Sequence, residues 1–394
     1  MGRAVSAPLE GIKVADFSNH AVGPWAASLL GRLGADVIKI EPPKGDPIRE
    51  ILPTSSGNPT SYTVVNQNKR SIVLDLKSPD QFAVALAIVD QADILVENFR
   101  SGVMDRLGLG YQALSQRNPG LVYCSSGSYG PAGPLASVGS TDSQGQAFGG
   151  YASLNGRPGT TAEICRNMAM IDSVGSLYLV QGALTALYAR TRTGHGQHVL
   201  CSQFGSVLGV QTSRLGHVFA TGESPRPMGT AVPHIVPSQA FRSRDGRWVN
   251  VSVVTPEQWR AFCRVVGREE WVDDPRLRTN AARVRNREDV VGEIASVIAE
   301  HEGTWWLHSF EAAGVPCGPY LDYEDLRTRS HFADNECFVA TELAGGGALT
   351  IPDAPWRFSG SELAPLRRAS VPDEQAAEIT AAVKRGEWPE RESA

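Results

Sequence analysis

Short apolar segments alternate with amphipathic ones along the first third of the chain. Four runs rich in Val and Ile are typical of strands, and they read GIKVADF, DVIKIEPP, SIVLDL and DILVENF. Helical spacing appears between them, first in a helix from about Pro24 to Gly34 and then in SPDQFAVALAIVDQA. A helix over 111–117 precedes a fifth strand, in GLVYCSSGSYG. The alternation predicts an α/β fold with a parallel sheet, whose ligands bind beyond the carboxyl ends of the strands.

The pattern changes after the fifth strand. Residues 139–207 are glycine-rich and then helical, and residues 221–239 are typical of a linker or mobile loop. The segment AFRSRDGRWVNVSVV predicts a hairpin that turns at Asp245-Gly246, and amphipathic helices follow it. These features predict a smaller α+β domain. The tail contains the strand-like GALTIPD and a polar helix near residues 374–384.

Composition narrows the function classes. A length of 394 residues favours about two domains, and a net charge of −5 provides no broad basic field for nucleic acid. No apolar run reaches the roughly 18–20 residues without polar breaks that a membrane span needs. The six cysteines form no CxxC pair and no zinc-finger spacing. We therefore expect reduced thiols in a cytoplasmic protein without a metal site or a membrane partner.

Asp172 stands where a long apolar segment begins, in MAMIDSVGSLYLVQGALTALYAR. Aspartate is favoured as a helix N-cap, because its oxygens accept orphan backbone N–H groups. A carboxylate at a helix start can also act as a nucleophile. Common signatures of dinucleotide folds, NTPases, α/β-hydrolases and zincins are absent, namely GxGxxG, GxxxxGK[ST], GxSxG and HExxH. The residues alone leave both roles of Asp172 open.

Several segments, taken in order, resemble the class III CoA-transferases and the related α-methylacyl-CoA racemases. They include GPWAASLLGRLGADVIKIEPPKGDPIR, NQNKRSIVLDLKSP, ADILVENFRSGVMDRLGLGYQALSQRNPGLVYCSSGSYGPAGP, TGHGQHV and GVPCGPY. The resemblance implies a Rossmann-like large domain made of residues 1–220 and 326–394, with a linker and smaller α+β domain at 221–325. It also implies a homodimer of two interlocked chains.

The same resemblance implies an enzyme that moves CoA from an acyl-CoA donor to a carboxylic acid acceptor. Asp172 takes the position of the family's catalytic aspartate, which forms a mixed anhydride and an aspartyl-CoA thioester. No permanently bound cofactor is implied, since CoA enters as a thioester substrate. Both intermediates hydrolyse, so water must be excluded, and segment 222–238 is a candidate lid. Its stretch PRPMGTAVPHIVPS, residues 225–238, has only Gly229 where oxalate/formate members carry four glycines, which favours a bulkier or more apolar acceptor.

CoA needs cations, backbone donors and apolar walls for its phosphates, adenine and pantetheine arm. By position, the resemblance implies CoA contacts at Ala21, Val22, Leu74, Lys77, Asn98, Phe99, Arg100 and Arg106. Asp142 is the implied acidic neighbour of the site, with a solvated loop acid as the alternative. Pro42 stands where many relatives carry arginine, which removes one expected contact. The backbone of Gly149 and Gly150 is expected to approach the reacting carbonyl.

Two alternatives to a transferase stay open. Racemisation needs an acid and a base on opposite faces of the α-carbon. The racemase pattern supplies a histidine before the acid at Asp142 and a glutamate before the proline of VVTPEQW. This chain has Thr141 and Thr255 at those positions, and a threonine hydroxyl does not act as a general acid or base near neutral pH. The second alternative is a non-catalytic CoA-binding homologue, against which the intact Asp172 argues.

Overall fold

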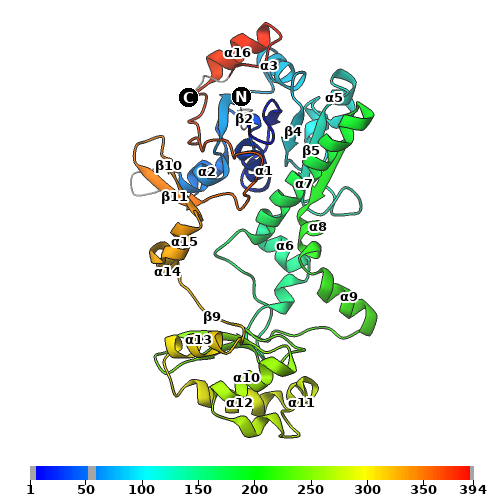
Figure 1. Cartoon of the computed structure of the whole chain (residues 1–394). Coiled ribbons are helices and arrows are strands. Elements are labelled where there is room, and N and C mark those ends of the chain that lie inside the picture. Colours follow the sequence, from blue (N-terminus) through cyan, green and yellow to red (C-terminus); the bar gives the residue numbers. More distant parts are fainter. Residues whose placement is uncertain (1–5, 52–58, 391–394) are drawn as a thin grey trace. The chain divides into compact units, whose positions relative to one another are not determined.

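The computed structural model describes residues 6–51 and 59–390 (Figure 1). Its centre is a parallel six-stranded sheet in the order β3-β2-β1-β4-β5-β6. The strands are β1 (Lys13–Asp16), β2 (Asp36–Glu41), β3 (Lys69–Val73), β4 (Ile94–Glu97), β5 (Val122–Gly127) and β6 (His198–Ser202). The predicted parallel α/β fold is therefore confirmed. From β1 the strand order runs to β3 on one side, and from β4 it runs to β6 on the other, so the order reverses between β1 and β4. In such sheets ligands bind beyond the carboxyl ends of the strands at this point.

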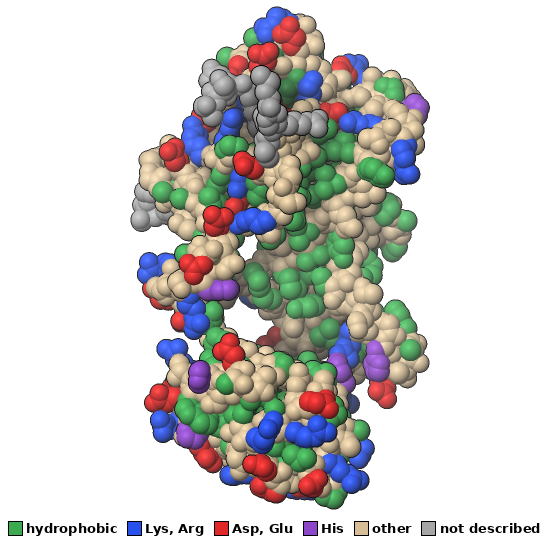
Figure 2. Space-filling view, viewed as in Figure 1, with side chains coloured by type: hydrophobic (Ala, Val, Ile, Leu, Met, Phe, Trp, Pro, Cys, Tyr) green, Lys and Arg blue, Asp and Glu red, His purple; other side chains and the backbone are tan. Residues whose placement is uncertain are grey.

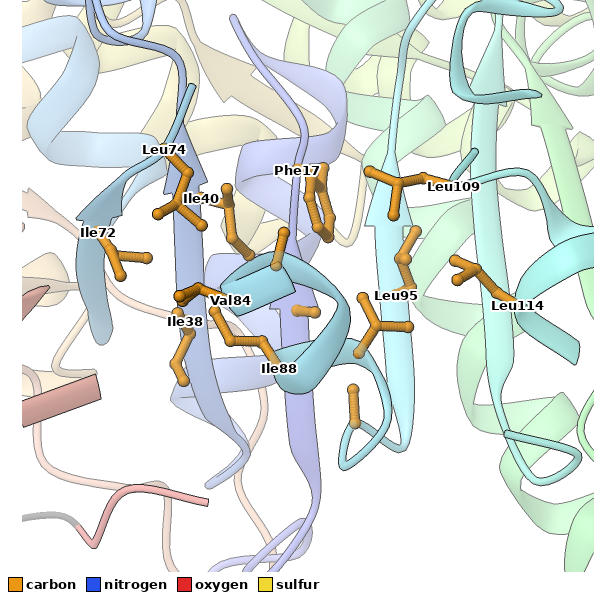
Figure 3. Packing of buried hydrophobic residues seen from close by; sticks show 14 of the residues in the cluster. Phe17, Ile38, Ile40, Ile72, Leu74, Val84, Ile88, Leu95, Leu109 and Leu114 are labelled. Carbon is orange, nitrogen blue, oxygen red and sulfur yellow. The ribbon is translucent and has the colours of Figure 1, made fainter. Parts of the chain in front are cut away.

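Helices cover both faces of the sheet. One face carries α3 (Pro79–Val89), α5 (Tyr111–Arg117) and α16 (Ala376–Lys384), and the other carries α1 (Val22–Arg32) and α7 (Met170–Thr193). Figure 3 shows Val84 and Ile88 of α3 between Ile38 of β2 and Leu95 of β4. Because helices cover both faces, strands β1 to β5 are largely buried. The helix expected from Pro24 begins two residues earlier, at Val22.

The long helix α7 lies directly on the sheet. A Cβ atom added at Gly182 would stand 2.6 Å from Val199 Cγ1 on β6, so glycine permits this close approach. Among the described residues, α7 is the one helix whose length and composition would suit a membrane span. Its side chains Leu179 and Ala183 are nevertheless buried in the core with β5 and α1. Core helices of globular proteins pass the same length test, so α7 is weak support for a membrane segment.

The pattern of residues 139–207 indicates only glycine-rich and helical structure, yet it also contains strand β6. Shorter helices of this half are α2 (Thr60–Val65), α4 (Val103–Arg106), α6 (Asp142–Phe148), α8 (Gln203–Gly209) and α9 (Thr212–Thr221). The central sheet and these helices belong to the first of two compact units, which comprises the described parts of residues 1–152, 164–223 and 333–394. The hairpin of β10 (Phe338–Glu342) and β11 (Ala348–Pro352) belongs to the same unit. The strand predicted from GALTIPD corresponds to β11.

Residues 153–163 and 224–332 form a second compact unit. Its antiparallel sheet contains β7 (Ser238–Arg242), β8 (Trp248–Ser252) and β9 (Cys317–Pro319), and the predicted Asp245-Gly246 turn joins the first two. The helices are α10 (Pro256–Val265), α11 (Asn280–Arg285), α12 (Arg287–Ile298), α13 (Gly303–Ala312) and α14 (Tyr323–Thr328). Stacked rings fill the core, with Trp259 and Phe262 centred 5.6 Å apart. The short α15 (Ser330–Asp334) follows α14.

Candidate active site

The start of α7 is capped by a residue distant in sequence. The N-cap position is Ala169, so Asp172 lies inside the first turn, and the alternative in which Asp172 itself caps the helix is wrong. Asp142 replaces it, because its Oδ2 accepts the backbone N–H of Ile171 at 2.6 Å and of Asp172 at 3.1 Å. A carboxylate at this end accepts hydrogen bonds from backbone N–H groups that have no partner within the helix, and it interacts favourably with the positive end of the helix dipole. The side chain of Asp172 is therefore not needed for capping.

One carboxylate oxygen of Asp172 is held and the other is free. Gln203 donates from Nε2 to Asp172 Oδ1 at 2.5 Å, and Ser140 Oγ donates in turn to Gln203 Oε1. Asp172 Oδ2 accepts no hydrogen bond from the described residues. Burial raises the pKa of Asp172 to about 6, with a smaller contribution from the charge of Asp142, while the Gln203 hydrogen bond opposes the rise. At neutral pH the carboxylate is mostly ionised, with one oxygen open for attack.

Hydrogen bonds also fix the side chain of Asp142. Its Oδ1 accepts a hydrogen bond from Gln146 Nε2 at 2.5 Å, and Gln146 Oε1 accepts from the backbone N–H of Cys165 at 2.8 Å. Gln146 is fully buried. Asp142 is thus a partly buried group beside Asp172, and the alternative of a solvated loop acid does not describe it.

The glutamines of this site carry no signature that would single them out in the sequence. Gln203 is the first residue of α8 and follows β6 directly. It therefore lies at the carboxyl end of a strand, where ligand sites form in such sheets. Recognising β6 in HVLCS would have pointed to Gln203. Gln146 is one helical turn after Asp142, a spacing that brings two side chains together.

The loop between β1 and α1 meets the loop after β4. Asn19 N–H donates to Asn98 Oδ1 at 2.8 Å, and Asn98 Nδ2 donates to the Asn19 carbonyl at 2.7 Å. Ser176 of α7 donates to the Val22 carbonyl at 2.8 Å, which ties the start of α1 to α7. The predicted CoA-contact residues Ala21, Val22 and Asn98 therefore lie along one edge of the sheet, near the start of α7.

Buried ion pairs stabilise this edge of the sheet. Lys69 Nζ lies 2.7 Å from Asp16 Oδ2, and Lys39 Nζ lies 2.9 Å from Asp46 Oδ2 and donates to the Ser18 carbonyl at 2.8 Å. Burial alone would raise the pKa of Asp16, but the charges of Lys69 and Lys39 lower it. Removing one member of such a pair leaves an unpaired buried charge and costs about 3–5 kcal/mol.

The three cationic side chains predicted to bind CoA are exposed. Lys77, Arg100 and Arg106 form no ion pair with any residue in 6–51 or 59–390. Phe99 is partly buried against the core, and Leu74 lies within it.

Four positions weighed from the sequence have structural roles. The N–H groups of Gly149 and Gly150 bond to the carbonyls of Gly145 and Ala147, so they end α6 and are not free to stabilise an oxyanion. Thr141 and Thr255, where racemases carry proton-transfer groups, each begin a helix with a capping box. The described residues contain no group of three or more His, Cys, Asp or Glu side chains suited to a metal ion.

A cavity of about 500 Å³ lies beside Asp172, within the first unit. Its walls come from α1, the end of α2, the first turns of α7 and residues 351–356. This volume lies in the range of about 300–1,000 Å³ that is usual for small-molecule sites. A nucleophile at the edge of such a cavity has a place for a substrate to bind.

Comparison with known proteins identifies the family. Residues 9–375 match the model of CoA-transferase family III. The chain belongs to this family. It is 34% identical to the acetyl-CoA:oxalate CoA-transferase of Acetobacter aceti over 94% of this chain and 95% of the relative. It is 30% identical to the succinyl-CoA:glutarate CoA-transferase of Homo sapiens over 91% and 82% of the two chains.

Solved structures of family III relatives have the same fold. A CAIB/BAIF family protein from Brucella suis superposes with a TM-score of 0.85 at 31% identity, covering 96% of this chain and 100% of the other. Rv3272 from Mycobacterium tuberculosis gives a TM-score of 0.85 at 28% identity, with 95% and 99% covered. The family resemblance inferred from the sequence motifs is confirmed.

Proposed function

We propose that this family III protein transfers CoA from an acyl-CoA donor to a carboxylic acid acceptor, with Asp172 as the nucleophile. The observation that carries the proposal is the state of Asp172. Its carboxylate is mostly buried, holds one oxygen on Gln203 and presents the other at the edge of a cavity. The names of its relatives, which describe CoA-transferases, support the same reaction class.

The reaction balances without metal or redox chemistry. Asp172 Oδ2 attacks the thioester carbonyl, the C–S bond breaks, and a mixed anhydride and CoA thiolate result. The thiolate then attacks the aspartyl carbonyl, which releases the donor acid and leaves CoA as a thioester on Asp172. The acceptor carboxylate attacks that thioester to form a second anhydride. The thiolate finally attacks the acceptor acyl carbon, giving the new acyl-CoA and free Asp172.

The supporting residues have distinct tasks in this scheme. Asp142 fixes the first turn of α7 through two backbone N–H groups, and Gln203 fixes the orientation of the nucleophile. Lys77, Arg100 and Arg106 would hold the phosphates of CoA, since they are exposed and carry no competing acid. The first unit would thus be the CoA-binding domain. A cytoplasmic location stays a prediction.

A homodimer is part of the proposal, in the interlocked form that the resemblance implies. Figure 2 shows hydrophobic side chains gathered over the region where Figure 1 draws α7 and α8. Helix α9 contains no buried residue, and its Phe219 is 83% exposed. Tyr188 and Phe148 are also exposed. Apolar side chains gathered in this way are typical of an interface.

The test is a transfer assay on the purified protein. One acyl-CoA and a different free acid are mixed, and both acyl-CoA species are followed by chromatography. Ping-pong kinetics, with formation of the second acyl-CoA faster than hydrolysis of the first, are expected. Exchange of the α-proton with solvent deuterium in place of transfer would favour the racemase alternative. Binding of CoA without turnover would favour the non-catalytic one.

A further inference from the structure

The cavity beside Asp172 has an apolar lining. Its walls include two tryptophans and four aliphatic side chains, namely Trp25, Leu29, Val64, Val65, Leu177 and Trp356. They come from four segments of the first unit, so the lining is built by the fold and not by one loop. Apolar walls of this kind favour an apolar ligand, because each buried methylene gains free energy on leaving water.

The positive charge in this lining is already neutralised. Among the described residues that line the cavity, Arg32 is the only cation. Its Nε and Nη2 donate to the two carboxylate oxygens of Asp353 at 3.0 and 2.9 Å, and Nη1 donates to the Ala364 carbonyl. Burial alone would raise the pKa of Asp353, but the hydrogen bonds from Arg32 lower it, so the pair stays ionised. The guanidinium of Arg32 is therefore not available to pair with a substrate carboxylate.

A second carboxylate on the acyl group would be poorly accommodated. Asp172 already places one negative charge at the edge of the cavity, and a dicarboxylate would bring another into an apolar lining without a free cation. One buried amide nitrogen in the lining, Gln67 Nε2, has no hydrogen-bond partner among the described residues. A neutral amide can serve a carbonyl or hydroxyl oxygen, but it does not balance a full charge.

We propose that this cavity binds the acyl chain of the substrate and selects uncharged, apolar acyl groups over dicarboxylates. The inference rests on the proposed function and narrows its substrate class to monocarboxylic acids with an aliphatic or branched chain. The acyl chain lies between α1 and α7, with its carbonyl at Asp172 and its far end near Trp356.

The test compares two donors of matched shape. Succinyl-CoA and isocaproyl-CoA differ in that an isopropyl group replaces the second carboxylate. Each is mixed with the full-length protein without acceptor, and the rate of CoA attachment to Asp172 is followed by intact mass. The second-order rate constant for CoA attachment is expected to be at least tenfold higher for isocaproyl-CoA than for succinyl-CoA. Extending the chain from butyryl to hexanoyl should raise it by up to about fourfold per methylene buried.

Variants of the lining test whether this cavity is responsible. Leu177→Arg places a cation at a partly exposed wall position, and it is expected to move the succinyl-to-isocaproyl ratio at least tenfold toward succinyl-CoA. Leu177→Met, the matched control, should leave the ratio within about twofold, since Leu and Met exchange is well tolerated. Asp353→Asn, which leaves Arg32 unneutralised, should move the ratio in the same direction as Leu177→Arg.

The outcomes separate this inference from the proposed function. An Asp172 adduct that forms equally well or faster from succinyl-CoA would overturn the apolar selection while leaving the transferase intact. A ratio unchanged in both Leu177→Arg and Asp353→Asn would show that the acyl chain binds elsewhere. Absence of an adduct from every donor would contradict the proposed function itself.

Discussion

Replacing Asp172 by asparagine is expected to stabilise the fold while abolishing CoA transfer. Burial and the charge of Asp142 raise the pKa of Asp172 from 3.8 to about 6, so the folded protein holds this proton more tightly than the unfolded chain. At neutral pH the ionised carboxylate therefore destabilises the folded state. The difference corresponds to about 3 kcal/mol, at 1.36 kcal/mol per pH unit. Asparagine carries no charge and retains an oxygen that accepts the hydrogen bond from Gln203.

The size of this effect depends on pH in a defined window. Below about pH 4, Asp172 is protonated in both states, and the variant and the parent differ little in charge. Between pH 4 and 6 the unfolded chain loses its proton first, so the parent loses stability relative to the variant. Above about pH 6 the stability advantage of Asp172→Asn is complete and constant.

The assay is thermal unfolding of both proteins at a series of pH values from 4.5 to 8. With about 2–4 °C in Tm per kcal/mol for domains of this size, the variant should unfold several degrees higher at pH 7.5 and much closer to the parent at pH 4.5. Asp90→Asn is the control, because Asp90 is a surface carboxylate paired with Arg117 and should change stability by less than about 1 kcal/mol. A variant no more stable than the parent at pH 7.5, or a gain that persists unchanged at pH 4.5, would refute the reasoning.

Three further predictions concern activity. The rate of CoA attachment to Asp172 should fall below about pH 6, where its carboxylate becomes protonated, and a profile flat down to pH 4.5 would contradict this. Gln203→Ala should move that acidic limb to higher pH and lower kcat about tenfold, with Gln203→Glu moving it further; an unmoved limb would mean that Gln203 does not act on Asp172. Arg106→Ala should raise KM for the CoA thioester about tenfold or more with little change in kcat, whereas Arg117→Ala, at an arginine already paired on the surface, should not; equal effects of both would remove the assigned phosphate contact.

Strong local patterns allowed much of the sheet to be predicted. Strands β1 to β5 are largely buried and carry β-branched or other apolar residues, and α5 begins and ends where its spacing indicates, at Tyr111 and Arg117. The sixth strand escaped prediction because HVLCS is short and partly exposed, so it lacks the apolar signal of a buried strand. Its absence from the prediction also hid Gln203, which owes its place in the site to the end of that strand.

The site could be predicted only as far as sequence neighbours define it. Asp172 stands out as an acid at the start of an apolar helix, but its capping partner, Asp142, precedes it by 30 residues. Only the family resemblance places both positions in one site, and periodicity and spacing give no reason to join them, because their contact depends on how α6 packs beside α7. The ion pair of Arg32 could not be predicted for the same reason, since its partner Asp353 lies more than 300 residues later in the sequence. Long-range contacts of this kind decide the charge of a site, and periodicity does not report them.

The central claim is that Asp172 carries CoA covalently. The most direct measurement is the intact mass of the protein after mixing with an acyl-CoA panel, followed by borohydride reduction and peptide mapping. The account predicts a CoA adduct, or its reduced product, on the peptide that contains Asp172, and none in Asp172→Asn. An adduct at another residue would contradict the claim, as would active transfer by Asp172→Asn.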